Sequence, residues 1–165
     1  MTELEAEVRA QLKELNPPEK HAKLVKYLIV LTREQARRQK INDRYLAATA
    51  VANPDEGTIC LIPDFRWDLA HEIGHLVWFK ILTKEQRESF CTLFNRESEE
   101  LLGLIMKVFG KFPSKMVSDV DPHSEKEEEV FAWHYAFYLL HEDYPRTYPK
   151  SCRWLRDNVF MDEEN

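Results

Sequence analysis

Residues 71–75 read His-Glu-Ile-Gly-His, and this short motif constrains the fold and chemistry of the chain more than any other feature. It lies in a stretch from about residue 65 to residue 82 that is apolar and compatible with a helix. His71 and His75 are one helical turn apart, so their imidazoles project from the same side and can share an ion. Zinc binds imidazole nitrogens in tetrahedral array. The motif therefore predicts one Zn²⁺ ion with His71 and His75 as ligands.

Glu72 stands about 100° further round the helix, beside the predicted metal and not on it. From there its carboxylate can take a proton from a zinc-activated water and deliver it to a leaving amine. Leu69 and Ile73 make the surroundings apolar, and polar side chains buried there cost free energy unless a metal or other partners satisfy them. The pattern thus indicates metalloprotease chemistry with Glu72 as the catalytic base and acid.

The third metal ligand is expected from the acidic run that follows residue 124. That run contains Glu125, Glu127, Glu128 and Glu129. Glu129 shares a helical stripe with Ala132 and Ala136, whose small side chains mark the face that can approach the motif helix closely. Acidic side chains in a first helical turn often only complement the helix dipole, which is our expectation for the others. We predict Glu129 as the third ligand, with Glu125 and Glu127 as alternatives.

The residue pattern predicts a helix-rich α+β fold. Thr2 and Glu5 can form the capping box of a first helix that stops at Pro17, and a second helix is predicted from about residue 18 to residue 40. Two apolar runs, 45–52 and 58–62, flank a turn-rich segment and predict a β-hairpin. A chain of 165 residues encloses one core but is short for two. We therefore expect a single domain spanning 1–165, with N-terminal helices at about 2–40 and a catalytic core at about 45–160.

Further helices are expected after the motif helix. Thr83 with Gln86 begins one by the same capping logic, and another from about residue 98 to residue 109 ends at Gly110. Residues 110–123 are predicted to form a loop, and Ser124 with Glu127 to cap the helix that carries Glu129. A last amphipathic helix is predicted for residues 150–160.

Charge and cysteine content exclude some functions. The net charge is −6 and the basic residues are interspersed with acids, which argues against a nucleic-acid partner. Cys60, Cys91 and Cys152 are widely spaced and odd in number, so we expect reduced thiols and not a disulfide framework. The start of the sequence does not read as a signal peptide, and no stretch approaches the roughly 20 apolar residues that cross a bilayer. We expect a cytoplasmic protein with no membrane partner.

The hairpin, the His-Glu-Ile-Gly-His helix and the later segment Glu129-Val130-Phe131-Ala132 resemble the gluzincin zinc metallopeptidases. The resemblance covers roughly residues 45–160 and is nearest to the anthrax lethal factor catalytic domain and the Pro-Pro endopeptidases. It implies a zincin-like fold, zinc held by two histidines and a glutamate, and a substrate backbone that pairs with an edge of the hairpin. In that group the ligand glutamate directly precedes a Phe-Ala segment, which matches Glu129.

Two features depart from that group. Trp133 stands where the group usually carries a further glutamate, and no tyrosine lies between Gly110 and Glu129 to stabilise a tetrahedral intermediate. His123 is the nearest candidate for that catalytic role. A second resemblance, to the ImmA/IrrE-type peptidases, would move the metal ligand to Glu127, but the Ala-Asn pair of their helix is missing here.

The sequence therefore predicts a zinc-dependent endopeptidase that acts on a peptide or protein substrate. The alternative is a zinc-binding regulatory or interaction protein of zincin fold with little or no peptidase activity, which Trp133 and the missing tyrosine favour. Specificity depends on pocket shapes set by loops such as 110–123, so the sequence indicates neither the substrate nor the oligomeric state.

Overall fold

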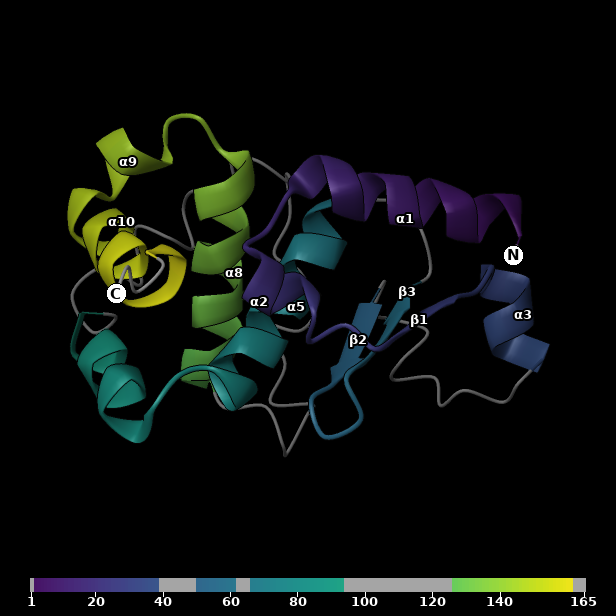
Figure 1. Cartoon of the computed structure of the whole chain (residues 1–165), viewed down its shortest axis with the longest axis horizontal. Coiled ribbons are helices and arrows are strands. Elements are labelled where there is room, and N and C mark those ends of the chain that lie inside the picture. Colours follow the sequence, from purple (N-terminus) through teal and green to yellow (C-terminus); the bar gives the residue numbers. More distant parts are fainter. Residues whose placement is uncertain (1, 39–49, 62–65, 94–125, 162–165) are drawn as a thin grey trace. The chain divides into compact units, whose positions relative to one another are not determined.

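A computed structural model describes residues 2–38, 50–61, 66–93 and 126–161 of the chain (Figure 1). The chain divides into two compact units, residues 1–81 and residues 82–165. The fold is helix-rich α+β, as predicted, and the described residues contain one three-stranded sheet. The expectation of a single domain stays a prediction.

The first helix, α1 (Glu3–Leu15), begins and ends at local signals in the sequence. The hydroxyl of Thr2 accepts a hydrogen bond from the backbone N–H of Glu5, and the Glu5 carboxylate accepts one from the N–H of Thr2. Asn16 ends the helix in the left-handed conformation, with φ 47°, and two prolines follow. The predicted capping box and stop are therefore confirmed, and the helix buries Val8 and Leu15.

The long second helix predicted for residues 18–40 is wrong. The segment forms α2 (Glu19–Ala22), β1 (Tyr27–Val30) and α3 (Arg33–Arg38) instead. The run Tyr-Leu-Ile-Val has the aromatic and β-branched side chains that favour strands, and pairing with another strand satisfies its backbone. A second capping box, in which Thr32 and Gln35 exchange hydrogen bonds, then begins α3. In the sequence, the helical spacing of the apolar residues hid both the strand propensity of residues 27–30 and the capping box of α3.

The predicted hairpin is confirmed by β2 (Ala50–Asn53) and β3 (Thr58–Leu61), which pair antiparallel. Residues 45–49 of the predicted first strand lie outside the described residues. Gly57 closes the turn with φ +68°, a conformation that suits glycine. The strand order is β1-β3-β2, and β1 runs parallel to β3 with Tyr27 opposite Thr58. The central strand of the sheet is therefore β3.

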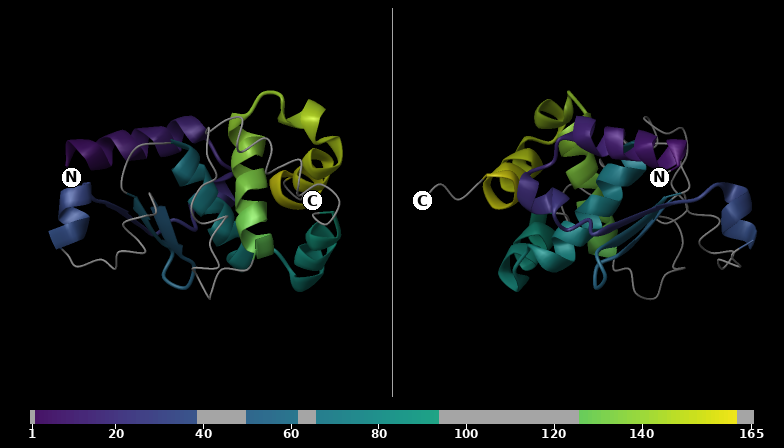
Figure 2. Two further views of the ribbon diagram at one scale, coloured as in Figure 1. Left: turned by 180° about the vertical axis from the view of Figure 1, so that it is seen from behind. Right: turned by 45° about the vertical axis from the view of Figure 1, so that its right-hand side comes forward.

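The motif helix is α5 (Arg66–Lys80), close to its predicted bounds. It packs against β2 and β3, and α1 and α2 also contact it (Figures 1 and 2). The side chains at this packing are fully enclosed: Ile59, Leu69, Ile73, Leu76 and Val77 all have no exposed surface. The sheet and the N-terminal helices thus hold the motif helix in the core of the first unit.

The second unit is helical and rich in aromatic side chains. Residues 84–93 are helical, and the predicted cap is confirmed because Thr83 and Gln86 exchange side-chain hydrogen bonds. The remaining elements are α8 (Lys126–Leu140), α9 (Tyr144–Thr147), α10 (Pro149–Leu155) and the π-helical turn η1 (Arg156–Phe160). The last predicted helix corresponds to α10 and η1 together. The predicted helix 98–109, the loop 110–123 and the cap residue Ser124 lie outside the described residues.

All three cysteines lie in the described ranges, each is half-buried, and none forms a disulfide. Among the described residues, no helix has both the length and the apolar content to cross a bilayer.

Candidate metal centre

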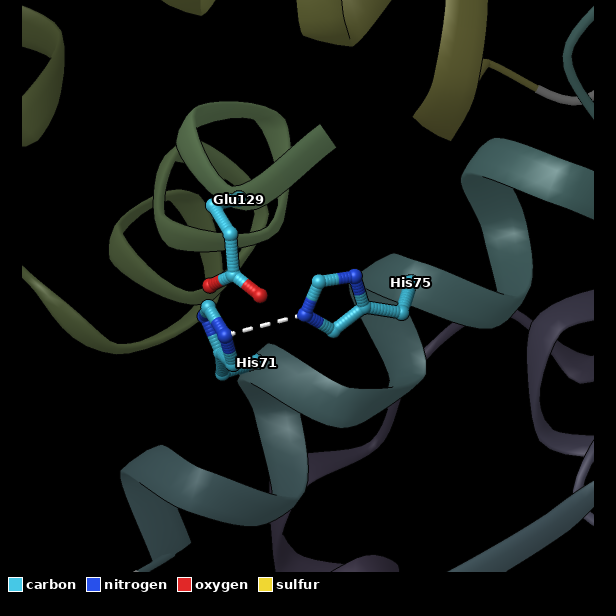
Figure 3. A group of neighbouring side chains, drawn as sticks. All are labelled: His71, His75 and Glu129. Carbon is cyan, nitrogen blue, oxygen red and sulfur yellow. Dashed lines mark hydrogen bonds between the residues drawn. The ribbon is translucent and has the colours of Figure 1, made fainter. Parts of the chain in front are cut away.

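The two motif histidines converge on a common point from one side of α5. Their Nε2 atoms are 3.1 Å apart, and the ring planes are almost perpendicular, at 88°. His71 is 3% exposed and His75 is 4% exposed, so neither imidazole lies in bulk water. Figure 3 shows the two rings turned toward one another from successive turns of the helix. The predicted one-turn spacing therefore produces the predicted pair.

Glu129 of α8 completes the cluster. Each of His71, His75 and Glu129 offers one ligand atom, and these atoms all lie within 4.8 Å of one another. The carboxylate of Glu129 lies beside the two rings in Figure 3, and its side chain is only 5% exposed. The three buried side chains are close enough to bind a metal ion. The trio is the one that the sequence predicted.

The spacing of the two imidazoles fits metal coordination. Two nitrogens that bind one ion at about 2.0–2.1 Å with a tetrahedral angle are about 3.3 Å apart, close to the separation of 3.1 Å found here. Two nitrogens and one carboxylate oxygen occupy three corners of a tetrahedron and leave the fourth open. The spacing of the residues present therefore fits a metal ion.

Glu72 lies next to His71 in the same buried environment, with 1% of its surface exposed. The pKa of the Cys60 thiol on β3 is raised, mainly because the thiol is partly buried. The negative charge of Glu72 raises this pKa further. The carboxylate of Glu72 is thus electrostatically coupled to the middle of the central strand. Sequence reasoning did not connect Cys60 with this site, although its place in an alternating strand next to the motif was a usable signal.

The other acidic candidates behave differently from Glu129. Glu127, the alternative ligand, is half-exposed and does not belong to the converging group. Glu128, for which the sequence predicted only that it complements the helix dipole, is 6% exposed. Glu125 and the proposed catalytic donor His123 lie outside the described residues.

Trp133, at the position where the resemblance stated above would place a further glutamate, is a buried side chain of α8. The indole is 4% exposed and packs against Phe137, with 6.3 Å between ring centroids. At about 40° from Glu129 around α8, it belongs to the same broad face as Ala132 and Ala136, which have no exposed surface. The indole of Trp133 and the two alanines therefore make this face of α8 largely apolar.

His134 is a buried histidine of α8 that sequence reasoning did not assign to the core. Its Nδ1 lies 2.6 Å from the hydroxyl oxygen of Tyr144, and the rings of Phe90 and Tyr148 stand edge-on to it. Burial lowers the pKa of His134 to about 3, so the imidazole is neutral near pH 7. It serves the packing of the second unit, and the one metal-binding group found among the described residues does not include it.

Comparisons with known proteins return no match: no family model, no curated protein and no solved structure is similar enough to this chain to report. The functional information in the described residues is thus the buried His-His-Glu cluster, with the carboxylate of Glu72 next to the first histidine in the sequence.

Proposed function

We propose that this chain is a zinc-dependent endopeptidase of the gluzincin type, in which His71, His75 and Glu129 bind zinc and Glu72 is the general base and acid. The observation that carries the proposal is the convergence of the three buried ligand side chains, with 3.1 Å between the two imidazole nitrogens. The motif and the Glu129-Val130-Phe131-Ala132 segment, which resemble that group, support it independently.

The donor set favours zinc over the hard cations. Calcium and magnesium prefer cages of oxygen ligands, whereas two imidazoles and one carboxylate with an open fourth position are typical of catalytic zinc. Zinc, when bound there, supplies a Lewis acid that polarises the scissile carbonyl and acidifies water. The buried surroundings of His71 and His75 strengthen the electrostatic interactions of whatever charge the site holds.

Glu72 then moves the protons. Its carboxylate takes a proton from the water whose oxygen bonds to the carbonyl carbon, and returns a proton to the amide nitrogen as the carbon–nitrogen bond breaks. The products are a carboxylic acid and an amine, so atoms and protons balance. A carboxylate with 1% exposure, adjacent to the first ligand, is protected from competing bulk water. His123 is the proposed donor that stabilises the developing oxyanion.

The sheet suggests where the substrate backbone lies. Of the two hairpin strands, β3 is paired on both sides, whereas β2 has only one partner among the described residues. An extended peptide can add to such an edge through main-chain hydrogen bonds. We therefore assign substrate pairing to β2 (Ala50–Asn53) and exclude β3 from that role.

The second candidate function is a zinc-binding regulatory or interaction protein without efficient hydrolysis. The buried indole of Trp133 favours it, because the gluzincin group usually places a charged, hydrogen-bonding side chain at that position. In this case the same three residues hold zinc for structure or sensing, and Glu72 has no substrate to protonate.

The zinc content of two variants tests whether Glu129 or Glu127 is the third ligand. Zinc per chain is measured by elemental analysis in the wild type, Glu129→Ala and Glu127→Ala, all purified and dialysed alike. The expected result is one zinc in the wild type and in Glu127→Ala, and little in Glu129→Ala. Absence of bound zinc in the wild type contradicts the proposal, and loss in Glu127→Ala alone moves the ligand to that residue.

Hydrolysis separates the two candidate functions. The wild type and Glu72→Gln are incubated with a broad library of quenched fluorescent peptides, and zinc content is measured in parallel. An endopeptidase cleaves part of the library, whereas Glu72→Gln keeps its zinc and loses cleavage, because it lacks the proton acceptor. Zinc without cleavage by the wild type favours the regulatory role, and cleavage by Glu72→Gln refutes the mechanism.

A further inference from the structure

The last described helical turn of the chain stacks on the helix that carries Glu129. The ring of Phe160 in η1 lies parallel to that of Tyr138, with 4.0 Å between centroids and 7° between planes. It also stacks on Tyr135, at 5.1 Å and 25°. Both tyrosines belong to α8, and Tyr135 is fully buried. One ring near the end of the described chain therefore contacts two successive turns of α8.

These contacts lie on the far side of α8 from the metal ligand. At 100° per residue, Tyr138 is about 180° from Glu129 around the helix, and Tyr135 about 120° away. A second aromatic contact holds the same side, because Phe131 packs edge-on against Phe90 and Trp154. Aromatic contacts opposite Glu129 thus restrain the rotation of α8 about its own axis.

Metal binding is sensitive to that rotation. A glutamate carboxylate stands about 5–6 Å from the helix axis, so a rotation of about 20° moves it by about 2 Å. Metal–ligand distances tolerate only about 0.2 Å. A small loss of restraint on the far side of α8 therefore has a large effect at the carboxylate.

We propose that Phe160 is a positioning residue for the metal centre, whose stacking on Tyr135 and Tyr138 orients α8 so that Glu129 reaches the ion bound by His71 and His75. The inference rests on the proposed zinc site and adds to it a residue outside the motif and its helices. The last described helical turn thereby influences metal affinity, although it provides no ligand.

The test compares variants of Phe160 with its neighbour in η1, Val159. Phe160 is half-buried, whereas Val159 is fully buried and has no ring to stack on α8. Zinc dissociation constants are measured by competition with a chromophoric chelator, and the ligand-field bands of the Co²⁺-substituted protein report the geometry. Circular dichroism and thermal unfolding verify the fold of each full-length variant.

We expect Phe160→Ala to weaken zinc binding by about tenfold or more and to alter the Co²⁺ bands. Phe160→Leu keeps apolar volume without a planar ring, and it is also expected to weaken zinc binding. It replaces the alanine variant in the test if that variant does not fold. Phe160→Tyr restores wild-type values. Val159→Ala lowers the unfolding temperature but leaves affinity within about threefold.

Wild-type affinity in both Phe160→Ala and Phe160→Leu overturns the proposal. Equal losses in Val159→Ala and Phe160→Ala also overturn it, because they reduce the effect to general stability. Failure of the wild type to bind zinc is a separate result, since it refutes the zinc site itself and would be seen before any variant is compared.

Discussion

Replacing His134 with phenylalanine is expected to make the protein resist acid better than the wild type. The wild-type imidazole is 1% exposed, surrounded by aromatic rings, and hydrogen-bonded to the hydroxyl of Tyr144. Burial holds its pKa at about 3 in the folded state, against 6.5 ordinarily. Between these values the unfolded chain binds a proton that the folded protein does not. The contribution of His134 to stability is therefore present above pH 6.5 and is lost as the pH falls toward 3.

The size of the effect follows from the two pKa values. Each pH unit in this range removes about 1.4 kcal/mol from the free energy of unfolding, and the whole range removes about 5 kcal/mol. His134→Phe fills a similar volume and cannot titrate, so it lacks this loss. Its stability at pH 7 is expected to be lower, because the Tyr144 hydroxyl loses its hydrogen bond, at a cost of about 1–3 kcal/mol.

Urea unfolding of the metal-free protein at pH 7, 6, 5 and 4.5, followed by tryptophan fluorescence, measures the difference. Trp154 lies against Phe90 in the same unit and reports its unfolding. Tyr144→Phe is the matched control, because it removes the hydrogen bond but leaves His134 buried and the pH dependence in place. Identical slopes with pH for the wild type and His134→Phe would refute this reasoning.

Two further predictions concern the first unit. Gly57→Ala is expected to destabilise the protein by about 1–3 kcal/mol in urea unfolding, since φ is +68° and a Cβ there would lie 2.6 Å from the Leu24 carbonyl oxygen; an unchanged midpoint contradicts this. Cys60 should react slowly with iodoacetamide at pH 8, because burial and the charge of Glu72 raise its pKa. Alkylation should be faster in Glu72→Gln, and an equal or slower rate would show that the two side chains are not coupled.

The candidate metal-binding residues were accessible to sequence reasoning because helical geometry determines their positions. The one-turn spacing of His71 and His75 brings their nitrogens together whatever surrounds the helix, and the structure shows the pair at 3.1 Å. Glu129 was chosen because it shares a stripe with two alanines, and both alanines are fully buried. Periodicity within one element thus predicted which residue of an acidic run takes part.

Strand β1 was missed because helical spacing of apolar residues outweighed the strand propensity of residues 27–30, and because its partner strand lies in another part of the chain. Val25, Leu28 and Leu31 have the spacing of a helix, and nothing local shows that Tyr27 will pair with Thr58. The stacking of Phe160 on Tyr138 was missed for the same reason. Contacts between distant segments depend on how the elements pack, which periodicity within one element does not encode.

The sheet also has an order of assembly. The hairpin of β2 and β3 joins neighbouring residues and closes across one short turn, whereas β1 pairs with β3 across the whole segment that separates Tyr27 from Thr58. Closing a longer loop costs more chain entropy, and such pairings form later. During synthesis β1 leaves the ribosome before either of its neighbours, yet it has no strand to join until β3 has followed. We therefore expect the first of these strands to be synthesised to be the last to enter the sheet.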